Sequence, residues 1–472
     1  MTNHKSVEAG KIESDDKQGP KLPVQTGGDA MHRSKKEMYP WERLELLQEK
    51  LYCKAKQERN FKFYVLYDKI FVPYVIEQAY YKVKRNGGAP GVDGVTFAMI
   101  EEEFGLGKFL LELREDLRKQ TYEPKAVRRK WIEKENGNGL RPLGIPTIRD
   151  RVAQMACLQI IEPIFEADFK DSSYGFRPKR GARNAMAAIK EYLREGRTEV
   201  FDADLSAYFD TIPHDKLMKT LELRISDPRV LNLIRKWLKS PVYEDGQYHK
   251  SKGEGTPQGG VISPLLANVY MHLVDRIVNN SKSLFHQAGI KIVRYADDFV
   301  LMGKRISLTV IEELKRILDK MGLKLNETKT RQIDATKESF NFLGFTVRYD
   351  RDIKGRSNKY WNIEASDKSE KKVRKKINDY LAVRGHFPAP EIAKGLNAIL
   401  RGWLNYYDIP GVSYPAMNKR KLHYYLTDRL YRYYNRKSQR RSRLYGPHAF
   451  EVLVTKHKLI NPMTYFVKSK LR

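Results

Sequence analysis

Two adjacent carboxylates, Asp297 and Asp298, separate two short apolar runs. Residues 292–293 precede the pair, residues 299–301 follow it, and both runs favour strands. The pattern predicts two strands joined by a tight turn, with the carboxylates at its tip. An Asp-Asp pair also occurs in ordinary hairpin turns, so these two residues alone do not establish a site.

A third carboxylate, Asp204, follows a short strand that we expect at residues 199–201. If this strand ends beside the Asp297-Asp298 turn, three carboxylates converge. Such a group can hold two divalent cations for phosphoryl or nucleotidyl transfer. Asp202 would point to the same face of the strand as Asp204, so spacing alone does not choose between them.

The charge of the chain favours a polyanionic partner. Its 88 Lys and Arg residues exceed its 58 Asp and Glu residues, which leaves a net charge of +30. Nucleic acid is the simplest such partner. An anionic membrane surface is the alternative, but the sequence has no long apolar run or basic amphipathic anchor, so we expect no membrane partner.

Composition limits the fold and the location further. A hydrophobic content of 41% is typical of a globular protein, and 472 residues are enough for two or three domains. The two cysteines, Cys53 and Cys157, exclude a disulfide framework and a cysteine-based zinc site. The polar N-terminus lacks the apolar core of a signal peptide, so we expect a disordered leader at residues 1–40 and an intracellular protein.

Hydrophobic periodicity predicts a mixed α/β body followed by a helical, basic C-terminal unit. Helices are expected at residues 41–81, 109–120, 149–169, 182–194, 265–274 and 306–321, and two more between residues 366 and 404. A strand pair at residues 126–133 and 140–145 is joined by Asn136-Gly137-Asn138-Gly139, a strong hairpin-turn signal. The charged segment 350–362 is expected to be a linker.

Several motifs occur in a fixed order. Tyr295-Ala296-Asp297-Asp298 and the upstream Asp204-Leu205-Ser206-Ala207-Tyr208-Phe209-Asp210 surround the carboxylates. Further motifs lie at residues 141–146, 149–151, 173–178, 255–264, 325–330, 342–345 and 401–407. Together they resemble the motifs of the reverse transcriptase/maturase proteins encoded by group II introns, and the resemblance covers residues 75–445.

The resemblance implies an α+β right-hand polymerase, with fingers, a palm built on an antiparallel sheet, a helical thumb and a basic C-terminal extension. The divisions expected after the leader are an N-terminal extension and fingers at 41–198, a palm with finger elements at 199–348, a linker and thumb/maturase domain at 349–410, and a basic nucleic-acid-binding segment at 411–472.

The resemblance also implies the catalytic residues. Asp204, Asp297 and Asp298 would be the catalytic carboxylates and the metal ligands, and the family pattern selects Asp204 over Asp202. The implied cofactor is a pair of Mg²⁺ ions, for which Mn²⁺ can substitute. Asp204 and Asp297 would hold the ions, and Asp298 would mainly support the site.

Nucleotide contacts are implied as well. Phe209 would lie beneath the incoming sugar and exclude a 2′-hydroxyl, although a core aromatic fits the same position. Gln258 would contact the incoming nucleotide, while its neighbouring glycines would let the backbone approach the base pair. Lys134 and Arg141, on opposite strands of the predicted hairpin, would clamp the triphosphate. Lys329 would lie near the phosphates or the primer end, or would be a solvated lysine.

RNA contacts are expected in two regions. Arg177 and Arg180 would either contact the template backbone or form structural ion pairs. The basic run 419–443 is the stronger candidate, because its cations can meet phosphates and its tyrosines can stack on unpaired bases. A solvated helix face is the alternative. The expected contact residues of the run are Lys419, Arg420, Arg436, Lys437, Arg440, Arg441 and Arg443, with tyrosines at 424, 425, 431, 433 and 434.

The implied function is RNA-directed DNA synthesis for a group II intron, with binding of the intron RNA to promote splicing and mobility. The partners would be intron RNA, an RNA template with a DNA primer, target DNA and dNTPs. No His-Asn-His endonuclease motif follows residue 445, so mobility would use pre-existing 3′ ends or reverse splicing alone.

Two other functions are alternatives. One is a splicing-only RNA-binding maturase, against which the intact Asp204, Asp297, Asp298 and Gln258 argue. The other is a domesticated relative in phage defence, DNA repair or CRISPR spacer acquisition. We expect a bacterial cytoplasmic protein associated with the nucleoid, or an organellar one. The oligomeric state and the intron class do not follow from the sequence.

Overall fold

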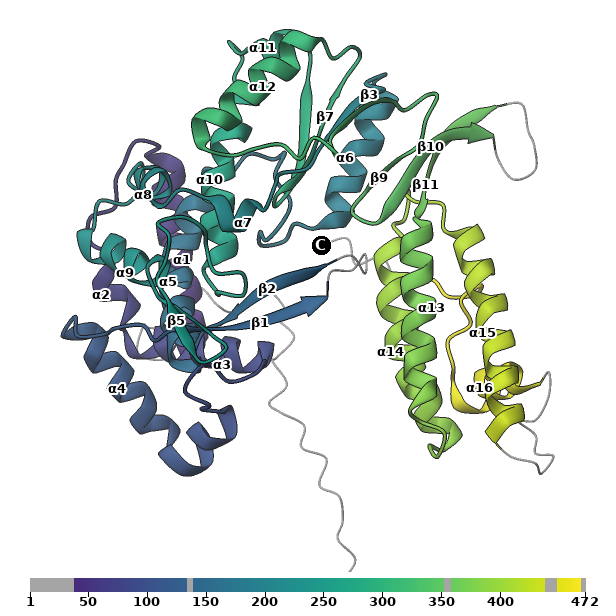
Figure 1. Ribbon diagram of the computed structural model, residues 1–472, viewed down its shortest axis with the longest axis horizontal. Helices are drawn as coiled ribbons and strands as arrows, with labels where there is room; N and C mark the ends of the chain where they lie inside the picture. Colours follow the sequence, from purple (N-terminus) through teal and green to yellow (C-terminus); the bar gives the residue numbers. More distant parts are fainter. Residues whose placement is uncertain (1–37, 134–138, 352–357, 438–447, 468–472) are drawn as a thin grey trace, which may run out of the picture.

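The computed structural model describes residues 38–133, 139–351, 358–437 and 448–467. In Figure 1 the chain forms three groups of elements: N-terminal helices with a strand hairpin, a central sheet with helices packed on it, and a set of C-terminal helices. The predicted α+β class is confirmed. Among the described residues, no helix is both long and apolar enough to cross a membrane.

The N-terminal group is arranged around α5 (Ile148–Glu166). Buried residues occur on every side of α5, which is the pattern of a helix enclosed by others. Thr147 caps its start, since the Thr147 hydroxyl accepts a hydrogen bond from the backbone N–H of Asp150. The other helices of this group are α1 (Pro40–Gln57), α2 (Tyr67–Ile70), α3 (Pro73–Asn86), the π-helix η1 (Met99–Phe104), α4 (Leu106–Arg118), α8 (His214–Leu221) and α9 (Pro228–Leu238).

The predicted strand hairpin is present. β1 (Val127–Glu133) pairs with β2 (Leu140–Ile145) in antiparallel register, although residues 134–138 of the turn lie outside the described residues. β4 (Val242–Glu244) and β5 (Gln247–His249) extend this sheet in the order β2-β1-β4-β5. Figure 1 shows β1 and β2 reaching from the N-terminal helices towards the C-terminal helices.

The central sheet has the strand order β6-β7-β3-β8, and all its neighbours are antiparallel. Its strands are β3 (Glu199–Ala203), β6 (Lys291–Tyr295), β7 (Asp298–Gly303) and β8 (Arg331–Asp334). Side chains alternate between the two faces: Phe201 and Leu301 join the core shared with the N-terminal helices, whereas Val200 and Val300 join a second core. The helices of this region are α6 (Ala182–Arg194), α7 (Tyr208–Thr211), α10 (Ser263–Val278), α11 (Leu284–Gln287) and α12 (Leu308–Met321).

The linker predicted at residues 350–362 is contradicted at both of its ends, which belong to strands, whereas residues 352–357 lie outside the described residues. β10 (Phe345–Arg351) and β11 (Lys359–Ala365) pair in antiparallel register, and β9 (Phe340–Phe342) completes a three-stranded sheet. On these strands the charged residues Arg348 and Glu364 adjoin Val347 and Ile363, which face each other and are fully buried. Charge on one face of a strand was therefore mistaken for a lack of structure.

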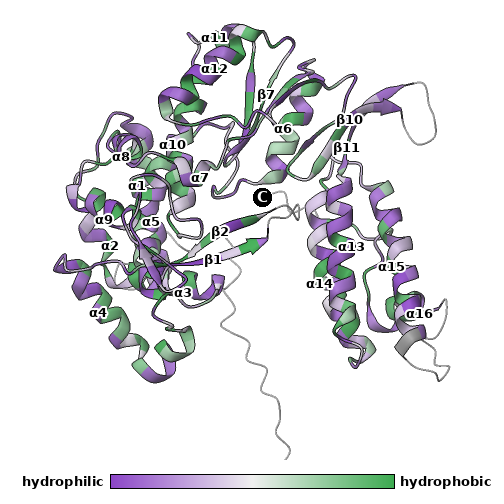
Figure 2. Ribbon diagram, viewed as in Figure 1, coloured by the Kyte–Doolittle hydropathy of each residue, from purple (hydrophilic) through white to green (hydrophobic). Residues whose placement is uncertain are grey.

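The C-terminal helices form one unit with a single core. It contains α13 (Asp367–Ala382), α14 (Ala389–Tyr407), α15 (Ala416–Lys437) and α16 (Ala449–His457). The expected division at residue 410 therefore falls inside a shared core and does not separate two units. Figure 2 shows that hydrophilic residues predominate along α13. Ser366 caps this helix, accepting a hydrogen bond from the backbone N–H of Ser369.

Candidate active site

The β6–β7 hairpin carries the adjacent carboxylates. Tyr295, the last residue of β6, pairs with Asp298, the first residue of β7. Ala296 and Asp297 alone make the turn between them, and Ala296 has a left-handed backbone with φ of +59°. The predicted arrangement of two strands with carboxylates at the tip is confirmed.

Asp204 lies next to this turn because β3 is the neighbour of β7. Ala203, the last residue of β3, pairs with Phe299, so Asp204 leaves the sheet beside Asp298. Alternation places Asp202, Asp204 and Asp298 on the sheet face that also carries Val200 and Val300. Three aspartates therefore share one face at one end of the sheet, with Asp297 at the adjoining turn.

Burial and neighbouring charges together set the electrostatics of the site. Burial raises the pKa of Asp298 to about 7, and the charges of Asp297 and Asp204 add to the rise. Burial also raises the pKa of Asp297, with a further contribution from Asp204 and an opposing one from Arg141. Carboxylates that repel one another across a short distance bind protons or cations more tightly.

Asp202 differs from Asp204 in its surroundings. Asp202 lies within β3, where its backbone is paired on both sides, and burial raises its pKa to about 6. Asp204 lies beyond the strand end, where its carbonyl accepts a hydrogen bond from Asn326 N at 2.8 Å and its N–H donates to the Thr330 hydroxyl. The geometry thus separates two residues that spacing alone left equivalent.

Lys329 belongs to the same loop and provides the countercharge. Its Nζ lies 3.3 Å from Asp204 Oδ2, with 60% of its side chain exposed. Lys329 is therefore at the carboxylates, and its long side chain retains freedom to move. The neighbourhood holds the oxygen donors that divalent cations prefer. Within the described residues, no three His, Cys, Asp or Glu side chains already stand as a set of metal ligands.

Phe209 and Gln258 lie on the adjoining segments. Phe209, on α7, is half-buried, and its ring contacts Tyr208 edge-on at 5.5 Å between centroids. Its carbonyl accepts a hydrogen bond from Thr256 N, which draws the 255–260 loop against α7. Gln258 Nε2 donates to Asp210 Oδ2 at 3.1 Å. The two predicted nucleotide contacts thus lie on neighbouring segments, which these hydrogen bonds join.

The glycines of the 255–260 loop are explained by contacts inside the protein. At Gly255, whose φ is +84°, an added Cβ would lie 2.9 Å from the carbonyl oxygen of Asp210. At Gly259 it would collide with the carbonyl of Gly144 on β2. Gly144 N also donates to Gln258 O at 2.6 Å. Close packing of this loop on β2 and α7 therefore requires glycine at these two positions, and the approach of their backbone to a base pair stays a prediction.

The hairpin supplies one of the two expected cations. Arg141 lies opposite Ile132 and is exposed. Burial raises the pKa of both Asp210 and Asp297, and the positive charge of Arg141 opposes that rise in each case. Lys134, its expected companion, lies outside the described residues.

Two expected RNA contacts are engaged inside the protein. The Arg177 guanidinium donates to both oxygens of Glu166 and to two backbone carbonyls, and 2% of its side chain is exposed. Lys419 Nζ lies 2.6 Å from Asp408 Oδ2 and donates to the carbonyl of Tyr465. The geometry supports structural ion pairs, so neither residue is retained as an RNA contact.

Other basic candidates have different outcomes. Arg180 pairs with Asp171 at 2.5 Å but stays partly exposed, and Arg420 is exposed on α15. The side chains of Arg436, Lys437, Arg440, Arg441 and Arg443 lie outside the described residues. Sequence reasoning missed a set of exposed lysines on α13, although the high density of lysines in this helix was a visible signal. They are Lys371, Lys372, Lys375 and Lys376.

The tyrosines of α15 divide into two sets. Tyr433 and Tyr434 are buried in the core of the C-terminal helices, which corrects the expectation that they stack on bases. Tyr425 is partly buried and donates its hydroxyl to the carbonyl of Arg374. Tyr424 and Tyr431 remain exposed, at 64% and 41%. Helical spacing directs some aromatics of one basic run inward and others outward.

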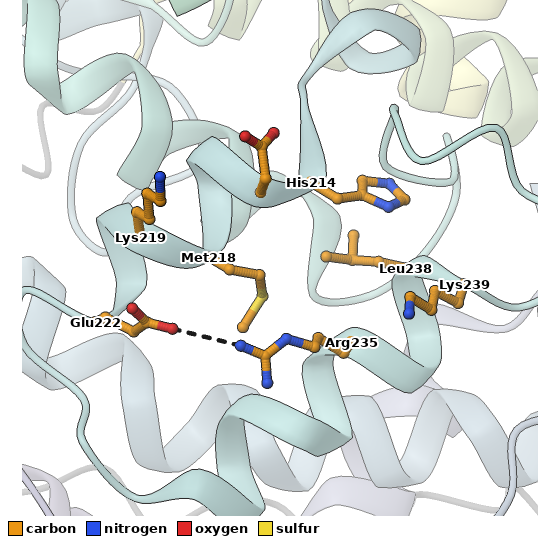
Figure 3. Close-up of a pocket in the computed structure, with 8 residues that line it drawn as sticks. His214, Met218, Lys219, Glu222, Arg235, Leu238 and Lys239 are labelled. Carbon is orange, nitrogen blue, oxygen red and sulfur yellow. Dashed lines mark hydrogen bonds and ion pairs between the residues drawn. The ribbon is translucent and has the colours of Figure 1, made fainter.

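Two cavities lie away from the carboxylates. The first, of about 390 Å³, lies between α8 and α9 and includes His214, Met218 and the Glu222–Arg235 ion pair (Figure 3). The second, of about 720 Å³, lies beside the end of α1 and is lined by residues of α5, α8 and α10. Neither cavity is lined by Asp204, Asp297 or Asp298.

Comparison with known proteins agrees with this geometry. The family described as reverse transcriptase (RNA-dependent DNA polymerase) matches residues 132–347, and the group II intron maturase-specific domain matches residues 370–446. Protein YkfC of Escherichia coli K12 is 38% identical over 294 residues, which cover 55% of this chain and 76% of that protein. The chain belongs to the group II intron reverse transcriptase/maturase family.

Other similar proteins are more distant. The group II intron-encoded protein LtrA of Lactococcus lactis is 31% identical over 349 residues, which span 61% of this chain and 57% of LtrA. Among solved structures, a partial Cas6-RT-Cas1–Cas2 complex is similar at 23% identity and a TM-score of 0.34, covering 54% of this chain and 42% of that one.

Family membership assigns the fold and the enzyme class. The central sheet is the palm of a right-hand polymerase, and the C-terminal helices carry the maturase domain. The enzyme class is RNA-directed DNA polymerase. Reverse transcriptase domains use divalent metal ions, and the two domains imply nucleic-acid partners.

Proposed function

We propose that the chain copies RNA into DNA at the palm carboxylates with two Mg²⁺ ions, and that it binds a group II intron RNA to promote splicing and mobility. The observation that carries the proposal is the convergence of Asp204, Asp297 and Asp298 at one end of the palm sheet. Their mutual repulsion and their oxygen donors suit hard divalent cations.

The residues around the carboxylates have complementary tasks. Asp204 and Asp297 would hold the ions, whose chemistry is to stabilise charge on the attacking 3′-oxygen and the leaving pyrophosphate. Arg141 lies on β2, where its positive charge opposes the rise in the pKa of Asp297, and would grip the triphosphate with its two-pronged guanidinium. Lys329 would shift from Asp204 towards the phosphates, since its exposed side chain permits that movement. Phe209 would exclude a 2′-hydroxyl from the sugar position.

The C-terminal helices would bind the intron RNA. Arg420 and the α13 lysines are exposed on these helices, and the net charge of +30 favours contact with phosphates. Tyr424 and Tyr431 are exposed aromatic surfaces on which unpaired bases can stack. The partners that follow are intron RNA, a primed RNA template and target DNA.

A primer-extension assay tests the catalytic half of the proposal. With an RNA template, a DNA primer, dNTPs and Mg²⁺, the wild-type protein is expected to make cDNA, whereas Asp297→Ala and Asp204→Ala are expected to make none. RNA affinity should stay within about twofold of wild type, because the carboxylates act on the transition state more than on template binding. Substantial synthesis by either variant would remove these residues from the site.

A further inference from the structure

Arg294 immediately precedes the Tyr295-Ala296-Asp297-Asp298 segment and is completely buried. Every N–H of its guanidinium has an acceptor. Nε and Nη2 donate to the Asp275 carboxylate, with the shortest distance 2.6 Å, and Nη2 also donates to Ser173 Oγ at 2.7 Å. Nη1 donates to Asn268 Oδ1 and to the carbonyl of Ala296, both at 2.9 Å.

The bond to the Ala296 carbonyl acts on the catalytic turn itself. Ala296 has a positive φ, which is uncommon for a residue with a Cβ and needs support from its surroundings. Arg294 gives that support by holding the peptide that joins Ala296 to Asp297. The guanidinium is in turn anchored on α10, through Asp275 and Asn268.

A second segment holds the turn from the side. The loop 172–175 pairs with the end of β6, since Arg294 N donates to Ser172 O and Tyr174 N donates to Arg294 O, both at 2.8 Å. Gly175 lies so close to the turn that an added Cβ would be 2.5 Å from Ala296 N. Asn268 Nδ2 donates to the Gly175 carbonyl, so one α10 residue holds both Arg294 and this loop.

Stability alone does not account for this arrangement. A buried ion pair costs desolvation, and well-packed apolar residues of similar volume often stabilise a fold as much or more. What an apolar group cannot do is direct several hydrogen bonds to fixed points. Here the fixed points are α10, the 172–175 loop and the peptide before Asp297.

We propose that Arg294, anchored by Asp275 and Asn268, is a positioning residue that fixes the Ala296–Asp297 peptide so that the Asp297 carboxylate meets Asp204 in the geometry that cation binding and phosphoryl transfer need. The inference rests on the proposed function of the carboxylates. Loss of the network would therefore lower the rate of chemistry and weaken the response to Mg²⁺ without removing a group that touches substrate.

Three variants of the full-length protein test the network. Arg294→Lys keeps the charge but cannot reach all its acceptors, Asp275→Asn removes the anchoring carboxylate, and Ser173→Ala removes a single hydrogen bond. Arg294→Lys and Asp275→Asn are expected to lower kcat about tenfold or more, because small misplacements of catalytic groups have large effects on rate. Both should raise the half-saturating Mg²⁺ concentration several-fold, in primer extension and in calorimetric titration of the protein with Mg²⁺ alone, while KM for dNTP changes little. Ser173→Ala should shift both quantities in the same direction but less.

A matched control comes from the N-terminal group. Arg224 is also buried, donates to the carbonyls of Ala55 and Phe61, and pairs with Asp168 at 3.0 Å. Arg224→Lys and Asp168→Asn should lower the melting temperature as a buried pair does, yet leave kcat and the Mg²⁺ response unchanged.

The outcomes separate the alternatives. If Asp275→Asn fails to fold, Arg294→Lys and Ser173→Ala decide the question. Folded network variants with wild-type kcat and Mg²⁺ response overturn the inference, as do control variants that lose kcat and Mg²⁺ response to the same extent. If the wild-type protein itself makes no cDNA, it is the proposed function that fails.

Discussion

Phe209 is the residue that we propose selects the sugar of the incoming nucleotide. It lies half-buried on α7, five positions after a carboxylate of the site, and its ring is supported by buried Tyr208. Phe209→Val is expected to admit a 2′-hydroxyl and to raise the efficiency of rNTP use relative to dNTP use by roughly tenfold or more. Primer extension with single nucleotides of each kind measures the ratio.

Tyr208→Phe provides the control for this prediction. It removes the hydroxyl that donates to the carbonyl of Ala267 and leaves the ring in place, so the dNTP/rNTP ratio should not change. An unchanged ratio in Phe209→Val would show instead that Phe209 is a core aromatic. If the dNTP/rNTP ratio changed in both variants, the cause would be altered packing of α7 and not the loss of the Phe209 ring.

At the residue scale, sequence reasoning found chemical groups but not their partners. The three carboxylates could be predicted because the hairpin and the strand end are local features of the pattern. Arg177 was left between two roles and Lys419 was assigned to RNA, because each cation is neutralised by a carboxylate whose position depends on the fold. Arg294 gave no signal for the same reason, since its acceptors come from α10 and from the 172–175 loop.

Asp227 connects elements of the N-terminal group and is fully buried. It caps α9 by accepting from Arg229 N, and its Oδ2 accepts from the backbone N–H groups of Leu66 and Tyr67, both at 2.9 Å. Burial alone would raise the pKa of this carboxyl, but the Arg229 guanidinium and these N–H groups hold it below its ordinary value. Asp227→Asn is expected to lower the free energy of unfolding by about 2–3 kcal/mol, since it removes charge-assisted hydrogen bonds.

The pH dependence of that destabilisation follows from the direction of the shift. A carboxyl with a depressed pKa in the folded state stabilises the fold above its ordinary pKa of about 3.9, and this contribution fades as the pH falls below that value. The difference in melting temperature between wild type and Asp227→Asn should therefore be constant from about pH 8 to pH 5. Ser283→Ala, which removes the cap of the four-residue helix α11, should cost less at every pH. A difference that vanished at neutral pH would contradict the assignment.

At the element scale, the hydrophobic pattern predicted a strand or helix correctly only where charged residues did not interrupt its apolar residues. The β6–β7 hairpin was predicted correctly because its apolar runs are uninterrupted. β10 and β11 were missed because charged residues occupy alternate positions and conceal Val347 and Ile363. Tyr433 and Tyr434 were assigned to RNA because the basic residues around them suggested an exposed run, whereas leucines on the same face of α15 form a core.

The whole molecule is organised around cores that do not follow the expected divisions. One core includes residues of both the N-terminal helices and the palm, such as Ile160 and Phe201. A second core joins the far face of the palm sheet to β9–β11 and includes Ile409, and a third belongs to the C-terminal helices. The boundary expected at residue 198 therefore does not separate independently packed units, which sequence patterning alone does not reveal.

A charge experiment on the full chain tests the role of the basic C-terminal region. Replacing Arg436, Lys437, Arg440 and Arg441 by Gln is expected to weaken binding of structured intron RNA and to reduce splicing assistance. The slope of log affinity against log salt should fall by up to about 0.7–0.9 for each phosphate that the variant no longer neutralises. Polymerisation on a short template should largely survive, because the palm carboxylates are untouched.

The control removes the same number of exposed cations from another surface. Lys304, Arg305, Lys315 and Lys320 lie on or just before α12, and their replacement by Gln lowers the net charge equally. If this variant binds the intron as weakly, only total charge matters. If the C-terminal variant stops polymerising and still binds the intron, the segment contacts the primer–template instead.

The packing of Gly259 and Gln258 against Gly144 has a mechanical consequence. A hydrogen bond from Gly144 N to Gln258 O and the close contact of Gly259 with the Gly144 carbonyl join the 255–260 loop to the base of the β1–β2 hairpin. The hairpin therefore cannot rotate about its base without displacing the 255–260 loop, so the two segments should move as one body. Any movement of the hairpin that brings Arg141 towards a triphosphate would also move Gln258. The contacts with the phosphates and the contact with the nucleotide would therefore form and break together.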